Sequence, residues 1–190
     1  MTIGSQREFL RTLVARLDAV GIPHMFSGSL ASSFHGEPRA TKDVDIVISA
    51  TAEQVARFVA SLGDEFYADT EAGRRACIDR GTFNVIHWGT GWKADLIVCK
   101  DRAFSREEFS RRRPMEMLGM RLFIVSPEDT ILSKLEWAKK GESERQLRDA
   151  AGVLLAQGAR LDRSYLLRWA AELGVSDLLS RLLGEVDRQP

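Results

Sequence analysis

The hydrophobic pattern of the chain changes at Ser126-Pro127, and this change limits the fold more than any other feature. After this dipeptide the apolar residues recur only at helical spacing, and Ser followed by Pro is a favoured helix start. Before it, helical segments alternate with short segments rich in β-branched residues. The sequence therefore predicts an α/β core at 1–125 and a helical region at 126–190.

Within the first part, two capping boxes mark the starts of helices. Ser5 and Glu8 precede a helical apolar pattern that ends at Gly21, and Thr51 and Gln54 precede another. A further short helix is expected at 29–35. Strands are expected at 24–27, 44–48, 66–68, 82–87, 94–99 and 121–125.

The connection between two of these strands decides the type of sheet. Strands 82–87 and 94–99 are separated by turn residues around Gly89 and Gly91. Such a turn is too short for the crossover that joins parallel strands, so this pair is antiparallel. The fold class is therefore α+β, a mixed sheet flanked by helices. The C-terminal region adds helices near 127–140, 144–157, 163–173 and 176–187.

The charge balance excludes a chain that binds nucleic acid through a general basic excess. Of the 190 residues, 27 are Lys or Arg and 27 are Asp or Glu, so the net charge is zero. A polynucleotide partner would need a local patch, and Arg111-Arg112-Arg113 is the one basic concentration. A solvated surface is the alternative interpretation of this run.

Cysteine usage and the N-terminal pattern indicate a cytoplasmic protein. The two cysteines, Cys77 and Cys99, lack metal-binding spacing, which favours a reducing compartment. Residues 1–8 contain no apolar signal-peptide core, and no apolar run is long enough to span a membrane.

Two carboxylates suggest the chemistry. Asp43 and Asp45 are two residues apart on a predicted strand, so both side chains point to the same face. Carboxylates placed this close repel each other and favour a bound cation. Mg²⁺ takes carboxylate oxygens and leaves room for substrate phosphates. A solvated sheet face is the simpler alternative for such a pair.

A third carboxylate and a glycine-serine pair extend this pattern. Asp95 begins a predicted core strand, where an acid is costly unless it is paired or bound to metal. Three acids at one sheet edge would suit two-metal nucleotidyl transfer. Gly28-Ser29 opens a helix directly after a strand, and a helix N-terminus offers backbone N–H groups to a phosphate.

Together, Gly28-Ser29, thirteen residues and Asp43-Val44-Asp45-Ile46 resemble the signature of the polymerase-β-like nucleotidyltransferase superfamily, and Asp95 matches its third acid. One departure is Ser27, where the family usually has an apolar residue. A narrower resemblance, to the AbiEii/AbiGii toxin-type nucleotidyltransferases, covers roughly 22–155. The residues that carry it are Arg39 to Asp45, Pro127-Glu128-Asp129, Lys134, Arg145 and Asp149.

The resemblance implies a polymerase-β-like fold, an NTP such as ATP as substrate, and Mg²⁺ or Mn²⁺ as cofactor. It implies that Asp43, Asp45 and Asp95 are catalytic and bind metal. It also implies that nucleotide is bound by Gly28, Ser29, Arg39, Lys42, Lys134 and Asp149. The acceptor is expected to be RNA, such as a tRNA end, or protein, and a toxin role implies an antitoxin partner.

Alternatives remain open at this point. The acceptor is a small molecule in the antibiotic-modifying nucleotidyltransferases, and a non-catalytic nucleotide-binding module is a further interpretation. Arg39 and Lys42 are also typical of a solvated loop. Lys134 is also typical of a snorkelling lysine, which buries its aliphatic stem and keeps its ammonium in water. Arg145 and Asp149 suit a surface ion pair. Trp88 and Trp92 bracket a turn and would either stack on a base or pack the turn.

Overall fold

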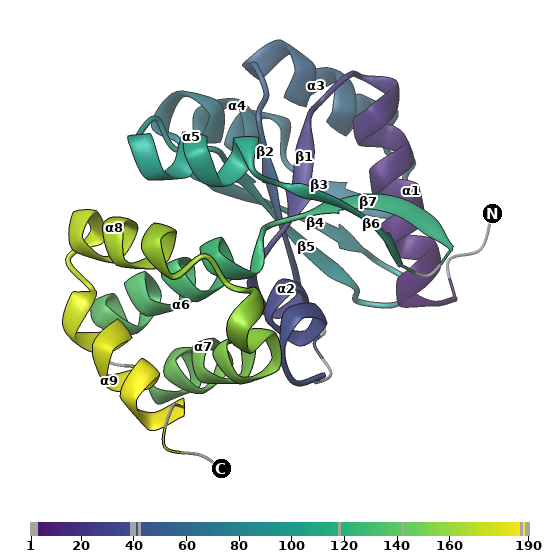
Figure 1. Ribbon diagram of the computed structural model, residues 1–190. Helices are drawn as coiled ribbons and strands as arrows, with labels where there is room; N and C mark the ends of the chain where they lie inside the picture. Colours follow the sequence, from purple (N-terminus) through teal and green to yellow (C-terminus); the bar gives the residue numbers. More distant parts are fainter. Residues whose placement is uncertain are drawn as a thin grey trace. The chain divides into compact units, whose positions relative to one another are not determined.

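The computed structural model describes residues 4–38, 41, 43–117, 119–141, 143–186 and 188. The chain forms two compact units (Figure 1). The sheet unit comprises Met1–Phe26 and Thr41–Ile124, and the helical unit comprises Ser27–Ala40 and Val125–Pro190. In the described residues, no helix combines the length and the apolar character needed to cross a membrane.

The sheet unit is built on a seven-stranded mixed sheet with the strand order β3-β4-β5-β2-β1-β7-β6. Strand β2 pairs in parallel with β5, and β1 with β7, whereas the other neighbouring strands are antiparallel. The predicted α+β class with a mixed sheet is therefore confirmed. The strands are β1 (His24–Phe26), β2 (Asp43–Ile48), β3 (Phe66–Ala68), β4 (Thr82–His87), β5 (Lys93–Val98), β6 (Arg113–Met117) and β7 (Met120–Ile124).

The helices of the sheet unit are α1 (Gln6–Ala19), α3 (Ala52–Ser61), α4 (Thr70–Asp79) and α5 (Ala103–Ser110). Both predicted capping boxes are present, one before α1 and one before α3. In each, the side chain of the capping residue accepts a hydrogen bond from the backbone N–H three residues later. The side chain at that later position accepts one from the backbone N–H of the capping residue.

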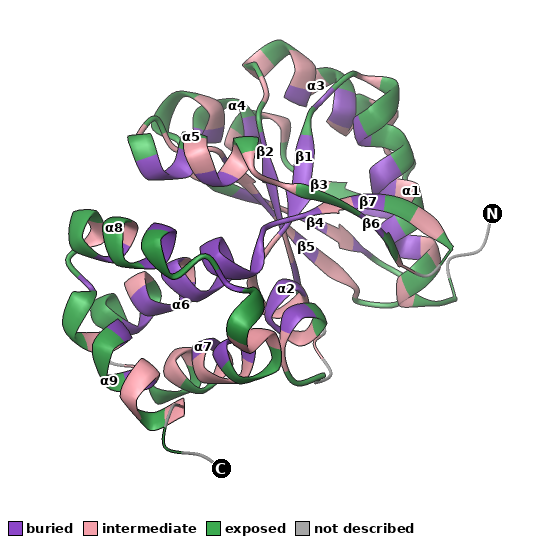
Figure 2. Ribbon diagram, viewed as in Figure 1, coloured by how far each residue is buried: buried purple, intermediate pink, exposed green. Residues whose placement is uncertain are grey.

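The two faces of the central strands differ in burial (Figure 2). Val44, Leu96 and Val85 lie on the buried face, which α1 and α4 cover. For example, the ring of Phe9 on α1 stacks on Phe66 of β3. Residues that alternate with these point to the opposite face, which is exposed or half-buried except at Val47. This second face carries the predicted acids.

The helical unit consists of α2 (Gly28–His35), α6 (Pro127–Gly141), α7 (Glu144–Gln157), the short 3-10 helix η1 (Gly158–Arg160), α8 (Arg163–Leu173) and α9 (Ser176–Val186). Helix α2 precedes β2 in the chain, yet it packs on α6 and α7. A Cβ at Gly36 would lie 2.8 Å from backbone atoms of Gly152 and Val153, so only glycine permits this approach of α2 to α7. The predicted domain boundary at 125/126 stays a prediction.

Three elements of the sheet unit were not expected from the sequence, namely α4, α5 and β6. The start of α4 could have been predicted from Asp69, a favoured capping residue. Its side chain accepts hydrogen bonds from the backbone N–H groups of Glu71 and Ala72. Helix α5 has no side-chain cap. Strand β6 lies at the sheet edge, where Pro114 is tolerated although it weakens the strand pattern.

Candidate functional site

The register of three strands brings the predicted acids into one row. Asp45 on β2 lies directly opposite Asp95 on β5, and Asp95 lies opposite Asn84 on β4. Neighbouring strands are about 4.8 Å apart, so these side chains are close neighbours. Asp43 lies two residues before Asp45 on the same face, opposite Lys93. The three predicted acids therefore gather on one face of the sheet unit, which we call the acid face.

Asp95 has two partners that the sequence did not reveal. The Lys93 ammonium lies 3.0 Å from Oδ1 and 3.3 Å from Oδ2 of Asp95. The Asn84 side-chain amide also donates to Oδ1. Lys93 is two residues before Asp95 on the same strand, so its place on the acid face was readable from alternation. Asn84 could be placed only once the register of β4 with β5 was known.

The surroundings of Lys93 favour its charged form. The hydrogen bond to Asp95 raises the pKa of Lys93, although partial burial acts in the opposite direction. The negative charges of Asp95, Asp43 and Asp45 raise this pKa further. A protonated lysine is therefore the cation that partly neutralises the acid row within the chain itself.

The acids of this face carry the donor atoms that a divalent metal ion takes. Carboxylate oxygens are the donors that Mg²⁺ and Mn²⁺ take, and Asp43 is exposed while Asp45 is half-buried. Among the described residues, no three His, Cys, Asp or Glu side chains are arranged to hold a metal. The donor type therefore fits, with Asp43 and Asp45 as ligands. Asp95 is engaged by Lys93 and Asn84 and would join them only if these contacts changed.

The start of α2 has the features of a phosphate-binding helix end. Gly28 is the first helical residue and has a φ of 59°, a conformation that residues with a side chain rarely adopt. Ser27 precedes it in extended conformation and its side chain does not cap the helix. First-turn N–H groups at such a helix start can bind an anion. The chain reaches Gly28 two residues after Phe26, which pairs with Ile46 beside Asp45.

Lys134 and Asp149, two of the predicted nucleotide-binding residues, contact each other in the helical unit. The Lys134 ammonium on α6 lies 2.7 Å from Oδ2 of Asp149 on α7. Their side chains are only 6% and 10% exposed. Lys134 is therefore not a snorkelling lysine, and Asp149 does not belong to an exposed ion pair. Ser32 on α2 lies 3.3 Å from the same Asp149 oxygen and can donate to it.

A polar pocket of about 310 Å³ adjoins this pair within the helical unit. Two arginines in the first turns of α7, Arg145 and Arg148, line it together with Glu37, and both arginines are exposed. The pocket lining also includes Ser32, Pro38, Asp149 and Gly152. The arginines give the pocket donors for an anionic ligand. Arg39 and Lys42, predicted as nucleotide contacts, lie outside the described residues.

The acids of Pro127-Glu128-Asp129 have structural partners. Asp129 is fully buried and accepts hydrogen bonds of 2.6 Å from the hydroxyls of Ser126 and Tyr165. Glu128 accepts from the backbone N–H of Asp162, which caps α8. These bonds tie the start of α6 to α8. A role in holding the helical unit together therefore accounts for both carboxylates.

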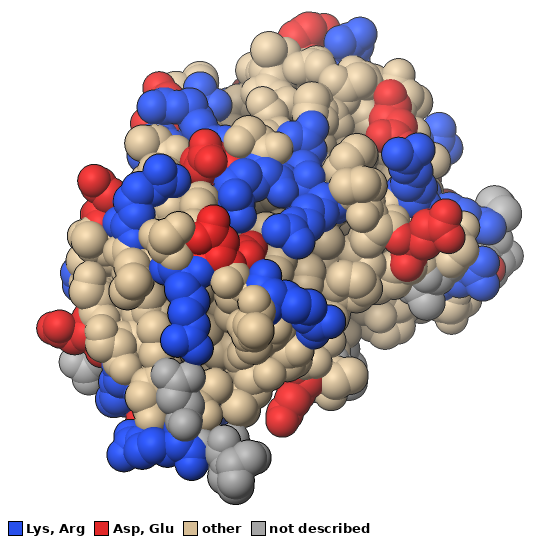
Figure 3. Space-filling view, viewed as in Figure 1, with Lys and Arg blue, Asp and Glu red and all other residues tan. Residues whose placement is uncertain are grey.

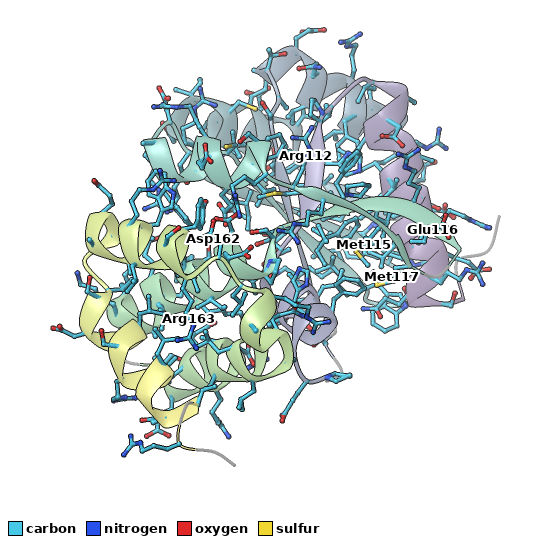
Figure 4. The ribbon with its side chains drawn as sticks, in the orientation of Figure 1. Arg112, Met115, Glu116, Met117, Asp162 and Arg163 are labelled. Atoms are coloured by element: carbon cyan, nitrogen blue, oxygen red, sulfur yellow. The ribbon has the colours of Figure 1, made fainter. Side chains whose placement is uncertain are left out.

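The arginine run is only partly available to a nucleic acid. The Arg112 guanidinium lies over the rings of Phe109 and Phe123, at 4.5 and 5.2 Å from their centroids, and donates to the Phe109 carbonyl (labelled in Figure 4). Figure 3 shows acidic and basic side chains interspersed on the displayed face. Arg112 therefore packs within the sheet unit rather than offering its charge to a phosphate backbone.

Comparison with solved structures places this geometry in a known fold. The chain is similar to the antibiotic-resistance factor ANT(2'')-Ia, whose solution structure gives a TM-score of 0.55 at 16% identity, over 88% of this chain and 94% of that one. The crystal structure of ANT(2'')-Ia with adenylyl-2''-tobramycin gives 0.58 at 16% identity, over 89% and 97%. An antigenic nucleotidyltransferase-like protein from Paracoccidioides brasiliensis gives 0.54 at 18% identity, over 90% of each chain.

The chain therefore has the nucleotidyltransferase fold. No protein-family model matches it, and no curated protein matches it. At such low identity the likeness establishes the fold, and the reaction has to be argued from the site.

Proposed function

We propose that this chain is a metal-dependent nucleotidyltransferase that moves an NMP group from an NTP, such as ATP, to an acceptor. The observation that carries the proposal is the register of Asp45 with Asp95, with Asp43 on the same face. In a chain with the nucleotidyltransferase fold, this is the arrangement of acids that phosphoryl-group chemistry needs.

The proposed transfer forms one P–O bond and breaks another. The oxygen of an acceptor hydroxyl attacks the α-phosphorus of the NTP and forms a new P–O bond. The bond from the α-phosphorus to the bridging oxygen breaks, and pyrophosphate leaves with that electron pair. The hydroxyl proton passes to a carboxylate of the acid face or to water. A bound Mg²⁺ or Mn²⁺ would stabilise the negative charge on the transferring phosphate.

The residues of the chain take distinct parts in this proposal. Asp43 and Asp45 would hold the metal, and Asp95 would orient the acceptor hydroxyl. Lys93 holds the Asp95 carboxylate at both oxygens, so it positions Asp95 before substrate arrives. Gly28 and Ser29 would donate backbone N–H groups to the β- and γ-phosphates. Lys134, Asp149, Arg39 and Lys42 are proposed as further nucleotide contacts.

A labelling experiment tests the transfer. The chain is incubated with Mg²⁺, α-³²P-labelled NTPs and a cell extract, and the extract is then separated into RNA, protein and small molecules. We expect label in one fraction and none with Asp45→Asn, whose side chain has nearly the same size without the charge. Label that survives Asp45→Asn would contradict the assignment.

The resemblance to AbiEii/AbiGii-type toxins supports a narrower proposal, in which the acceptor is RNA or protein and an antitoxin partner restrains the enzyme. Expression of the chain alone would then arrest growth, and Asp45→Ala would relieve the arrest. Arrest that persists in Asp45→Ala would contradict a toxin role based on transfer.

A further inference from the structure

One face of α7 forms a wall of the polar pocket in the helical unit. Arg145, Arg148, Asp149 and Gly152 all line this pocket. The last three follow Arg145 by three, four and seven residues, and this spacing places all four on one side of a helix. The two arginines therefore lie next to each other on the same surface of the pocket.

The end of α2 is held against α7 within the same unit (Figure 1). The Gln157 side chain on α7 donates to the His35 carbonyl at 2.7 Å. A Cβ at Gly36 would lie 2.8 Å from a backbone atom of Gly152, so the two backbones are in close contact here. Glu37, the next residue, lines the pocket. The pocket volume of about 310 Å³ is in the range of small-ligand sites.

The two arginines have no internal partner that accounts for their placement. Both are exposed, and neither forms a hydrogen bond or an ion pair with another described residue. Like charges on neighbouring positions of a helix repel each other. Arg145 also lies in the first turn of α7, where the helix dipole disfavours a cation. This placement costs stability unless an anion binds between the arginines.

The carboxylates that line the pocket do not neutralise both arginines. Asp149 lies 2.7 Å from the Lys134 ammonium, and its side chain is only 10% exposed. Glu37 is exposed and forms no ion pair with a described residue. When the Lys134–Asp149 pair is counted as neutral, two positive charges and one negative charge remain among the described lining residues. The pocket therefore attracts an anion.

Two guanidinium groups favour a terminal phosphate over other anions. Each guanidinium presents a planar set of N–H donors that matches two oxygens of a phosphate group. A phosphate monoester offers three such oxygens and a charge of about −1.5 to −2 at pH 7. A carboxylate has only two oxygens, and a phosphodiester carries a single charge.

We propose that Arg145 and Arg148 form a metal-independent binding site for a terminal phosphate group, either that of a monoester or the last phosphate of an NTP. Every residue of this site belongs to the helical unit, so the inference does not depend on the acid face or on the proposed function. Lys134 is not a phosphate ligand of this site, because its ammonium is bound to Asp149.

A phosphorus NMR titration of the full chain at low salt tests the site. The buffer contains EDTA, which keeps metal from the acid face. The probes are inorganic phosphate, phenyl phosphate and the singly charged dimethyl phosphate. We expect the first two to bind and dimethyl phosphate to bind at least about tenfold more weakly.

Variants of the two arginines locate the bound phosphate. Arg145→Met and Arg148→Met should each weaken phosphate binding about tenfold, the lower end of the range for a hydrogen bond to a charged group. Arg145→Lys should lose less, because it keeps the charge and loses only the planar donor set. Arg181→Met, which removes an exposed arginine of α9 outside the pocket lining, should change nothing.

Two results would overturn the inference. One is equal phosphate affinity in wild type and in Arg145→Met/Arg148→Met, which would place the phosphate elsewhere, for example at the start of α2. The other is dimethyl phosphate binding as tightly as inorganic phosphate. Thermal melts of each variant show that it is folded.

A competition titration identifies the source of the phosphate group. If an NTP supplies it, saturating inorganic phosphate and Arg145→Met should each weaken the binding of Mg²⁺-NTP. Unchanged NTP binding in both experiments assigns the pocket to a separate phosphorylated ligand. Failure of the wild-type chain to bind any NTP would count against the proposed function alone, since the phosphate titration contains neither NTP nor metal.

Discussion

Lys134 on α6 and Asp149 on α7 form an ion pair of 2.7 Å between two side chains that are almost completely buried. Each charge has lost most of its contact with water, and the ion pair offsets part of that cost. Removal of one partner should therefore lower the free energy of unfolding more than removal of both.

We expect Lys134→Met and Asp149→Leu to lower the free energy of unfolding by about 3–5 kcal/mol each, because the remaining buried charge loses its ion-pair partner. The double variant should recover most of this loss in urea unfolding. If Lys134 also contacts nucleotide, the double variant will bind NTP more weakly despite its restored stability. Additive losses in the double variant would show that the two side chains do not interact.

Lys93 gives a prediction for the pH dependence of stability. Its raised pKa means that the folded chain holds this proton more tightly than the unfolded chain, whose lysine has a pKa near 10.5. The stabilising contribution is therefore complete below pH 10.5 and is lost as pH rises through the folded pKa. Urea midpoints of wild type and Lys93→Met should converge above pH 10.5. A constant gap up to pH 12 would contradict this.

The same lysine gives a prediction for metal binding. Lys93→Met removes the internal cation from the acid face, so Mn²⁺ should bind more tightly to the variant than to wild type. Titration followed by the paramagnetic signal of free Mn²⁺ measures this without any reaction. Lys100→Met, which changes a lysine outside the strand, is the matched control. Equal affinities in wild type and Lys93→Met would exclude Lys93 as a competitor of the metal.

Tyr165 tests the network that joins α6 to α8. Its hydroxyl donates to the buried Asp129 carboxylate at 2.6 Å. Tyr165→Phe should lower the free energy of unfolding by about 1–3 kcal/mol, the usual cost of a hydrogen bond lost from a charged group. Tyr67→Phe is the control, because Tyr67 is exposed, and it should change little. Equal effects of the two substitutions would contradict a special role for the Asp129 network.

The row of acids could be predicted from the sequence because its signals are local. Alternation put Asp43 and Asp45 on one face, and a β-branched segment put Asp95 on another strand. The antiparallel pair β4 and β5 was predictable from its short turn, but the register and the pairing of strands distant in the chain were not, because they depend on packing between distant segments. The place of Asn84 opposite Asp95 and the contact of Lys134 with Asp149 depend on such packing.

Helix α2 illustrates the same limit. Its sequence predicts a helix after Gly28, which the structure confirms. Its position in the chain suggests membership of the sheet unit, whereas its contacts place it with α6 and α7. That placement depends on Gly36, where a Cβ would lie 2.8 Å from backbone atoms of Gly152 and Val153.

The central claim is that Asp43 and Asp45 hold a metal-bound NTP. The most direct test is calorimetric titration of the chain with each NTP, with and without Mg²⁺, for wild type and for the double variant Asp43→Asn/Asp45→Asn. The account predicts binding that needs Mg²⁺ and is lost in the variant, while the variant melts at or above the wild-type temperature because like charges have been removed. Nucleotide binding that is equally strong without Mg²⁺, or that persists in the variant, would contradict it.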